Sequence, residues 1–524
     1  MGVFGDSWAI DAMAIFVILL TSIYLYFKRQ YAYWDRKGIK TLPGLNYLAG
    51  HFGALYLQKE SIADLSVRLY RSSNEPYEGM YGFLRRILMI RDPELIRKIL
   101  IKDFDYFTDR GNEINEDYDP LTGNLVNLPG HKWRSVRREL TPTFASGKLK
   151  AMFPTLLECG SSLESYLAKV ADNGGILDVV DISARHGTNV IASIFFGIEI
   201  DCVVDPDNDF RKYGSRIFAT TTWNAFKRLS RFVAPQVIRF FRIKFADPGV
   251  ENFIHSLVKE NLEYRERYNI IRKDFFQLLI QLRNTGNVQK DDEWETVIKN
   301  DGSQKKMSLD EIKAHSFAFF GAGFETSSTT MSFCMYELAK NPDIQERVRN
   351  EIKTVLAQHN EQITYESVSE MKYLGYCIDE TLRMYNVFPT VARKCVKDYQ
   401  IPDTDKIIEK GDLIIFPSFA AHRDEKYYPN PENFDPERFN EQNSAGKNQI
   451  NRPYLPFGDG PRNCIGLRLG KMQVQVGLVI MLQKFKYELT DSLKNRKMEF
   501  AIKGTNVAPR DAIQLNVSKI QKSL

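Results

Sequence analysis

One stretch of ten residues, FGDGPRNCIG at positions 457–466, constrains this chain more than any other. Three glycines and a proline surround a single cysteine, Cys464. Glycine adopts backbone angles that other residues resist and proline fixes one more, so the stretch predicts a rigid loop of special shape. A long apolar segment follows from Leu467. We expect a helix there, whose N-terminal N–H groups and dipole favour a thiolate at Cys464.

The surroundings of Cys464 limit the kinds of site that it can form. No second cysteine and no histidine lies near it in the sequence, which argues against a tetrahedral zinc site and an iron–sulfur cluster. A lone thiolate can serve as the single axial ligand of a haem iron. The alternative is a buried, inert cysteine in a glycine-rich turn.

The order Phe-x-x-Gly-x-Arg-x-Cys-x-Gly in this loop resembles the haem-binding loop of the cytochrome P450 family. Every fixed position is filled, among them Phe457, Arg462, Cys464 and Gly466. The resemblance implies that Cys464 is the axial iron ligand of haem b (iron protoporphyrin IX). It also implies that Phe457, Arg462 and Gly466 bind the cofactor, Arg462 through a propionate group.

A second stretch, AFFGAGFET at 318–326, predicts the inner face of a long helix. Ser308 followed three residues later by Glu311 predicts the start of that helix with a capping box. Ala318, Ala322 and Thr326 recur every four residues, so they place small side chains on one face. Such a face either leaves room for a flat cofactor or serves ordinary helix packing.

Gly321 and Gly323 each cost this helix about 1 kcal/mol relative to alanine. We expect that these glycines keep side chains away from the cofactor. The order Ala-Gly-x-Glu-Thr resembles the motif with which cytochromes P450 activate dioxygen. The resemblance implies that Ala322 faces the cofactor and that Glu325 and Thr326 are catalytic, supplying a carboxylate and a hydroxyl to a proton relay.

Glu380 and Arg383 lie three residues apart on a predicted helix. Pairs at this spacing are usually weak surface contacts. The P450 likeness implies instead a buried charge network that includes Arg438 from the sequence PERF at 436–439. Such a network shapes the core near the haem and takes part in no reaction step.

Trp133 and Arg137 lie four residues apart and place an indole N–H and a guanidinium on one helix face. This pair is a reasonable clamp for a carboxylate, although the same spacing is common in plain surface packing. The pair resembles the P450 motif Trp-x-x-x-Arg. By the same resemblance, Arg110 and Arg393 are further partners of the haem propionates.

The N-terminus predicts a membrane anchor, because residues 12–27 carry no charge and roughly match the ~20 residues that cross a bilayer. Basic residues follow, beginning with Lys28 and Arg29, so the remainder of the chain is expected in the cytosol. Neither the basic start nor the cleavage site of a signal peptide is present. We expect residues 1–30 to be a single-pass anchor in the endoplasmic reticulum membrane; the alternative is a buried helix.

The composition of the 524 residues, 43% hydrophobic and 12% aromatic, supports one large core. A net charge of +5 is too small to argue for nucleic acid. Six scattered cysteines without a CxxC pair fit a reducing compartment. By resemblance, residues 31–524 form one cytochrome P450 haem-thiolate domain, mainly α-helical with a smaller β-rich lobe.

The stretch TPTFASGKL at 141–149 resembles microsomal, xenobiotic-metabolising members, above all the insect detoxification P450s of family 6. The resemblance implies a monooxygenase that inserts one oxygen atom from dioxygen into a lipophilic substrate, either a xenobiotic such as a plant toxin or insecticide or an endogenous lipid or hormone. No GxGxxG fingerprint and no spare length for a flavin domain are present. Electrons are therefore expected from a separate protein. For a member anchored in the endoplasmic reticulum the resemblance implies NADPH–cytochrome P450 reductase, and it admits cytochrome b5 as a second partner. The basic residues Arg462, Arg468 and Lys471 are expected to attract the acidic partner.

Two other functions stay open at this point. A haem-thiolate isomerase or dehydratase would need neither dioxygen nor reductase, and the intact Thr326 disfavours it. A membrane-anchored protein could instead bind haem or lipid without turnover. Residues 226–245 alternate bulky apolar and basic side chains, which fits either a membrane-surface segment or an ordinary helix pair with solvated arginines.

Overall fold

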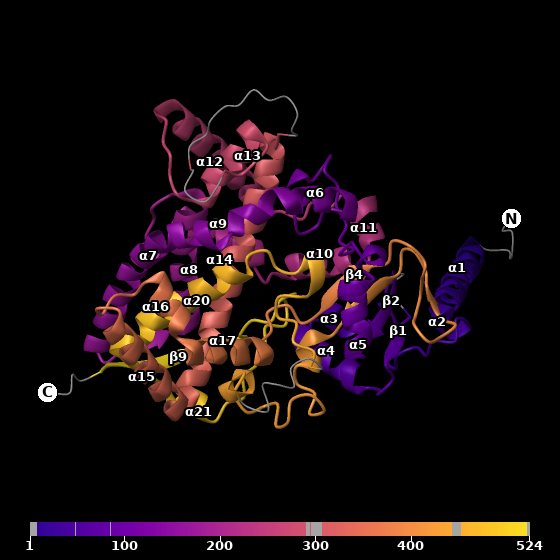
Figure 1. Cartoon of the computed structure of the whole chain (residues 1–524). Helices are drawn as coiled ribbons and strands as arrows, with labels where there is room; N and C mark the ends of the chain where they lie inside the picture. Colours follow the sequence, from indigo (N-terminus) through magenta and orange to yellow (C-terminus); the bar gives the residue numbers. More distant parts are fainter. Residues whose placement is uncertain are drawn as a thin grey trace.

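A computed structural model describes residues 8–47, 49–83, 85–289, 294, 306–442 and 452–520 of the chain. Helices form most of the molecule, and its four-stranded sheet lies in a smaller lobe on the side of the N-terminal helix α1 (Figure 1). The predicted fold, mainly helical with a smaller β-rich lobe, is confirmed.

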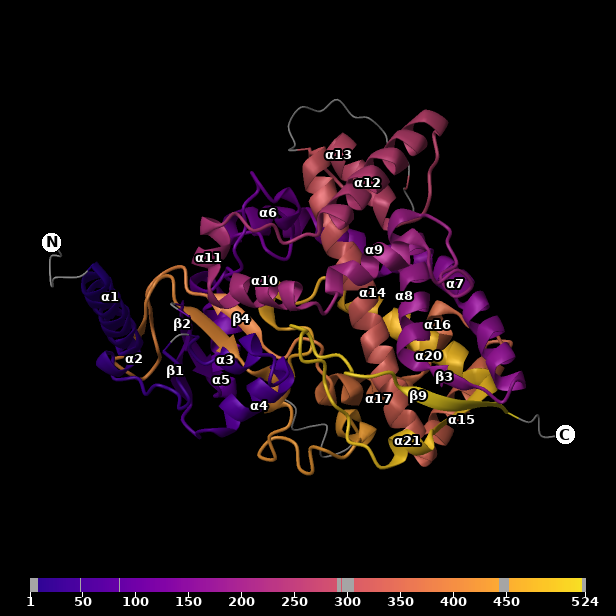
Figure 2. The ribbon, with the colours of Figure 1, turned by 180° about the vertical axis from the view of Figure 1, so that it is seen from behind.

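The helix α14 (Leu309–Lys340) runs through the middle of the helical part in both views (Figures 1 and 2). It packs against α8 (Val179–Phe196), α17 (Lys372–Met384) and α20 (Leu467–Lys484). The predicted start of α14 is confirmed, since Ser308 and Glu311 form both hydrogen bonds of a capping box. Because α14 is surrounded by other helices, residues on its inner face can line a site deep in the molecule.

The remaining α-helices of the described residues are shorter than α14. They are α2 (Tyr33–Arg36), α3 (Gly53–Tyr56), α4 (Ile62–Arg71), α5 (Pro93–Arg97), α6 (Gly130–Leu140), α7 (Ser146–Asp172), α9 (Asp209–Phe218), α10 (Thr222–Val233), α11 (Pro235–Phe240), α12 (Pro248–Tyr268), α13 (Phe275–Thr285), α15 (Pro342–Gln358), α16 (Tyr365–Glu370), α18 (Ser418–Ala421) and α21 (Asp491–Lys494). Of these, α2 to α5 lie in the sheet lobe (Figure 1).

The largest sheet has the strand order β1-β2-β7-β4. Its strands are β1 (Tyr77–Gly82), β2 (Arg85–Ile90), β7 (Leu413–Phe416) and β4 (Val391–Lys394). A second sheet joins β3 (Ile176–Asp178), β9 (Gln514–Lys519) and β8 (Phe485–Leu489), and β5 (Tyr399–Gln400) pairs with β6 (Ile407–Ile408). Buried side chains cover both faces of the largest sheet, and a larger cluster fills the space between the long helices.

The helix α1 (Trp8–Tyr31) is long and apolar enough to cross a membrane. Most of its side chains are exposed, but Phe27 and Tyr31 in its last turns are buried against the sheet lobe. The Tyr31 hydroxyl donates to the Phe83 carbonyl at 2.6 Å, and the indole of Trp34 in α2 is fully buried. The end of the apolar helix is therefore packed into the globular part.

Candidate active site

The loop that carries Cys464 is held in shape by its backbone. Gly460 has φ +70°, and a Cβ atom there would lie 1.9 Å from the Leu100 carbonyl oxygen, so only glycine fits. The Cys464 N–H donates to the Phe457 carbonyl at 2.8 Å and closes the loop. The helix α20 begins at Leu467, directly after the cysteine as predicted.

The Cys464 thiol is accessible, although protein atoms enclose it on most sides. This burial raises the pKa of the Cys464 thiol above its usual value. A hydrogen bond from the Gly466 N–H and the positive charges of Arg110 and Arg137 oppose that rise. The site therefore offers a thiol whose ionised form is supported by neighbouring donors, as a metal-ligating cysteine requires.

On α14, the Ala322 side chain is exposed, while Gly321 and Phe324 on the same helix are buried. The Thr326 hydroxyl donates to the Ala322 carbonyl at 2.7 Å. A helix residue with a solvent-accessible methyl group in the middle of the fold marks a place where the core leaves space. Ala322 and Thr326 therefore lie where the sequence predicted room for a cofactor.

The interpretation of Gly323 on α14 is wrong. A Cβ atom at Gly323 would lie 2.2 Å from Cδ1 of Ile191 in α8, so this glycine allows α8 to approach α14 closely. A Cβ atom at Gly321 would make only ordinary contacts, at 3.5 and 3.6 Å, with Ile217 and Phe218 of α9. The expected cofactor face is the stripe of small side chains at Ala318, Ala322 and Thr326.

Glu325 points away from this stripe toward other charged groups. Burial raises the pKa of the Glu325 carboxyl, and Arg211, a hydrogen bond from Asn506 and the charge of Arg228 oppose the rise. The Asn506 amide donates to Glu325 Oε1 at 3.4 Å. No local sequence pattern points to Asn506, because it lies 181 positions away from Glu325.

Two of the four predicted propionate-binding arginines have buried, unpartnered donors. Arg393 and Arg462 are each 2% exposed. The Nε and Nη2 atoms of Arg393 and the Nε and Nη1 atoms of Arg462 have no hydrogen-bond acceptor. Burial and the charge of Arg110 lower the pKa of Arg393 to about 9, and burial with Arg110 and Arg393 lowers that of Arg462 to about 8.

The other two arginines hold the cysteine loop. Arg110 donates to the Arg462 carbonyl at 3.1 Å. Arg137 donates to the Asn463 carbonyl at 3.0 Å and to its side-chain oxygen at 2.9 Å. Trp133 lies under Arg462, whose Cζ is 4.6 Å from the indole centroid. Trp133 and Arg137 thus both contact the cysteine loop.

These residues fit a flat, dianionic, metal-bearing cofactor. Within the part of the chain that the structure describes, none of the four guanidiniums forms an ion pair with a carboxylate. Asp109 and Asp459 lie farther off, and their charges offset only part of the repulsion between the arginines. Buried cations without a counter-ion are costly, so an anionic partner is expected. The accessible thiol of Cys464 and the open face at Ala322 complete a haem-binding set.

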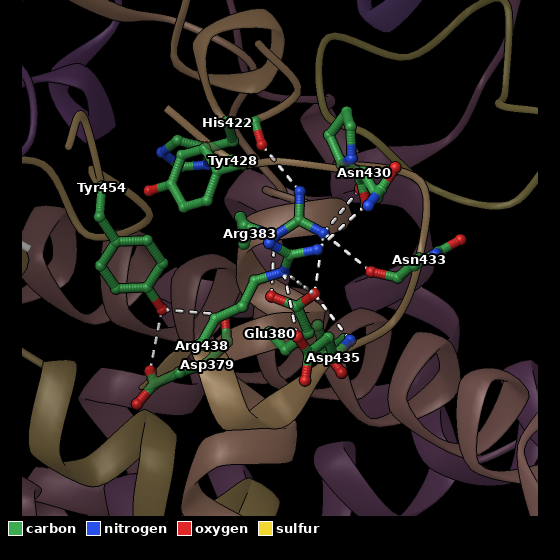
Figure 3. A network of polar contacts seen from close by, with 12 residues as sticks. Asp379, Glu380, Arg383, His422, Tyr428, Asn430, Asn433, Asp435, Arg438 and Tyr454 are labelled. Atoms are coloured by element: carbon green, nitrogen blue, oxygen red, sulfur yellow. Dashed lines mark hydrogen bonds and ion pairs between the residues drawn. The ribbon is translucent and has the colours of Figure 1, made fainter. Parts of the chain in front are cut away.

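The Glu380–Arg383 pair is fully buried, with both side chains at 0% exposure (Figure 3). Arg383 donates to both carboxylate oxygens at 2.7 and 2.9 Å, and also to the His422 and Pro431 carbonyls. Arg438 lies 3.4 Å from Glu380 and donates to the Asn430 carbonyl. The three residues that the sequence grouped as one network are in contact, and they tie α17 to the segment that leads to the cysteine loop.

The predicted docking surface needs a correction. Arg462 faces inward and donates to the Leu128 carbonyl, so it presents no charge to a partner protein. Arg468 is exposed and bonds Ser146 at 2.9 Å, while Lys471 is paired with Asp379 at 2.6 Å. Sequence order places all three near Cys464, but the loop turns the first of them toward the core.

The segment 226–245 forms the helix pair α10 and α11, but its basic residues are not all solvated. Lys227 and Arg231 are buried and donate to the Phe245 and Glu113 carbonyls at 3.2 and 2.8 Å. The exposed side chains of this segment include the apolar Phe240 and Phe241, at 81% and 67% exposure.

Comparison with known proteins agrees with this geometry. The family model for cytochrome P450 matches residues 48–514. The chain is 40% identical to cytochrome P450 6a2 of Drosophila melanogaster, over 92% of this chain and 95% of that protein. It is 37% identical to probable cytochrome P450 6d4 of the same species (96% and 97%) and 38% identical to cytochrome P450 6k1 of Blattella germanica (91% of each). The relatives compared are insect family 6 proteins, and the chain belongs to the cytochrome P450 family of haem-dependent monooxygenases.

Proposed function

We propose that the protein binds haem b through Cys464 and oxidises lipophilic molecules, among them xenobiotics such as plant toxins and insecticides, with electrons from NADPH–cytochrome P450 reductase. The observation that carries this proposal is the combination of an accessible thiol, flanked by the charges of Arg110 and Arg137, with the buried, unpartnered donors of Arg393 and Arg462. When bound, a thiolate-ligated haem supplies the chemistry of dioxygen activation.

Each residue of the site has a part in this proposal. Arg393 and Arg462 hold the propionates with their unpartnered donors, and Arg110 and Arg137 keep the loop around Cys464 in place. Phe457 and Gly466 stabilise the loop through the hydrogen bonds at the Cys464 N–H and sulfur. Ala322 leaves room beside the cofactor. The Thr326 hydroxyl and the Glu325 carboxylate would hold and pass protons on the open side of the site.

The electron donor is expected to bind beside the cysteine loop. The helix α6 holds that loop through Arg137 and carries exposed basic side chains at Lys132, Arg134 and Arg138. Lys132 pairs with Glu116 at 2.8 Å and Arg134 pairs with Asp105, so the positive surface offered to an acidic flavoprotein or to cytochrome b5 rests on Arg138 and the exposed Arg468. Low ionic strength should therefore strengthen reductase binding.

The substrate is expected to be lipophilic because aromatic side chains border the open space. Phe388, between α17 and β4, is 52% exposed, and the segment 387–392 that contains it is one proposed border of the pocket. Phe324 is fully buried, and its ring lies 5.9 Å from that of Phe218 in α9. The segments 104–130 and 205–245 are the other proposed borders.

The proposed location is the endoplasmic reticulum membrane, with α1 as a single-pass anchor and the catalytic domain in the cytosol. The apolar length of α1 and the basic residues after it support this orientation. Phe240 ends α11, and Phe241 follows it. We propose that these two exposed side chains rest on the same membrane surface.

A reduced carbon monoxide difference spectrum tests the central assignment. The wild type and a Cys159→Ala control, altered at a half-buried cysteine in α7, should give the spectrum of a thiolate-ligated haem. Cys464→Ala should lose it, and a retained thiolate spectrum would refute the assignment. Oxidation of NADPH is then measured with added reductase. A monooxygenase should consume NADPH, whereas a peroxide-rearranging isomerase would need neither NADPH nor the reductase.

A further inference from the structure

Asn506 lies in a tightly held turn near the end of the chain. The Ala501 N–H donates to the Ala508 carbonyl at 2.9 Å, and the Val507 N–H donates to the Val387 carbonyl at 2.8 Å. Asn506 itself is 6% exposed, and its amide donates to Glu325 Oε1 at 3.4 Å. The turn is therefore fixed at both ends, and its one side-chain amide reaches the carboxylate on α14.

Two arginines also face Glu325, but both are engaged elsewhere. Arg228 on α10 donates to the Ile217 and Ala219 carbonyls at 2.7 and 3.2 Å, at the end of α9. Arg211 on α9 lies 3.5 Å from Asp181. They act on Glu325 only through their charge. The directional contact comes from Asn506.

A neutral donor and a cation act differently on a buried carboxylate. A direct ion pair with arginine would hold the carboxylate as a permanent anion, whereas an amide orients it and leaves it able to exchange a proton. Burial already raises the pKa of the Glu325 carboxyl, and the Asn506 hydrogen bond opposes that rise. An amide is thus the suitable partner for a carboxylate that must pass protons.

We propose that Asn506 is a positioning residue that holds the Glu325 carboxylate in the orientation required for proton delivery. This inference rests on the proposed monooxygenase function, in which Glu325 and Thr326 serve the reduction of dioxygen. Reduction of dioxygen by two electrons and two protons releases hydrogen peroxide. Reduction by four electrons and four protons gives two water molecules. NADPH supplies the electrons through the reductase. Poor proton delivery therefore increases the share of hydrogen peroxide.

The test measures NADPH oxidation by the full-length protein with reductase and dioxygen alone, and the fraction of electrons recovered as hydrogen peroxide. Asn506→Ala should raise the ratio of peroxide to water by roughly 3- to 10-fold, the effect of losing one hydrogen bond. Asn506→Asp places a second carboxylate beside Glu325, so the pH dependence of the ratio should move to higher pH. Asn495→Ala, at an exposed asparagine after α21, should change neither.

A double variant separates positioning from a merely structural role. If Asn506 acts through Glu325, Asn506→Ala should have no further effect in a Glu325→Gln background. Equal effects in both backgrounds, or an unchanged pH dependence for Asn506→Asp, would overturn the proposal. The carbon monoxide spectrum of the wild type distinguishes failure of the proposed function from failure of the Asn506 proposal. A wild type without the thiolate-haem spectrum would refute the proposed function and would say nothing about Asn506. The comparison includes only variants that retain the carbon monoxide spectrum and the unfolding temperature of the wild type.

Discussion

The guanidinium of Arg85 donates to the backbone carbonyl of Gly111 at 2.7 Å and, through its other amino group, to the carbonyl of Phe232. One side chain at the start of β2 thus joins the segment after Arg110 to the end of α10. Arg85 is 8% exposed, and burial lowers its pKa to about 10. Gly111 has φ +77°, and a Cβ atom there would lie 2.6 Å from Nη2 of Arg85.

Gly111→Ala should therefore be more destabilising than its backbone angle alone explains. The left-handed backbone costs alanine roughly 1–2 kcal/mol, and clashes with Arg85 and with Leu413 Cδ1, 2.7 Å from the added Cβ, add to that cost. The matched control is Gly174→Ala, where φ is +62° and nothing lies within 4 Å of the added Cβ. Urea unfolding measures both free energies. Equal losses would show that Arg85 and Leu413 move aside freely.

Arg383→Met should cost about 3–5 kcal/mol of unfolding free energy, because it leaves the Glu380 carboxylate buried without its main partner. The control is Lys494→Met in the exposed pair Lys494–Asp491, which has the same spacing and a 2.7 Å contact. That change should cost about 0.5 kcal/mol or less. A similar small loss in both variants would contradict the burial of the Glu380 network.

His186 on α8 should make stability depend on pH in a defined window. It is fully buried, its ring nitrogens lack partners of good geometry, and burial lowers its pKa from 6.5 to about 4. Between these values the unfolded chain binds a proton that the folded one does not. Stability is therefore lost as pH falls from about 6.5 to 4, by about 1.4 kcal/mol per pH unit.

His186→Gln removes that titration, so unfolding free energies measured between pH 7 and 4 should fall less steeply than those of the wild type. His131→Gln, at an exposed histidine in α6, should leave the wild-type slope unchanged. A variant slope equal to that of the wild type would mean that His186 takes up its proton in the folded state as well.

Phe240→Trp should report contact with lipid. Phe240 and Phe241 are exposed, with ring centroids 4.9 Å apart. In full-length protein reconstituted into vesicles with brominated phosphatidylcholine, the added fluorescence at position 240 should be quenched. Tyr268→Trp, at an exposed aromatic residue that ends α12, should escape quenching. Equal quenching at both positions, or none at 240, would argue against the membrane contact.

The sequence predicted the parts of this molecule that depend on local order. The rigid loop around Cys464, the capping box at Ser308 and the stripe of Ala318, Ala322 and Thr326 all arise from residues close together in the chain. Several short motifs resemble those of cytochromes P450, and this resemblance predicted the mainly helical fold. Local sequence patterns therefore predicted the reaction class, that of a haem-dependent monooxygenase, correctly.

What the sequence could not predict depends on contacts between distant segments. Gly323 faces Ile191 across a helix interface, so its role in packing has no local signal. Arg462 was expected on a docking surface, but the left-handed turn at Gly460 directs the loop so that its guanidinium meets Trp133. Asn506 reaches Glu325 only because the chain returns to the centre after β8.

The burial of Phe27 and Tyr31 joins the end of α1 to the sheet lobe, so the two should move together. If α1 is the proposed membrane anchor, a rotation of α1 in the bilayer would turn the β1–β2 hairpin with it, since Tyr31 is bonded to Phe83 and packed on Tyr81. A truncated chain that begins at residue 31 loses Phe27 and leaves a gap in the lobe that carries Arg393. Lipid thickness, which would set the tilt of such an anchor, would thereby set the angle at which the active site faces the membrane.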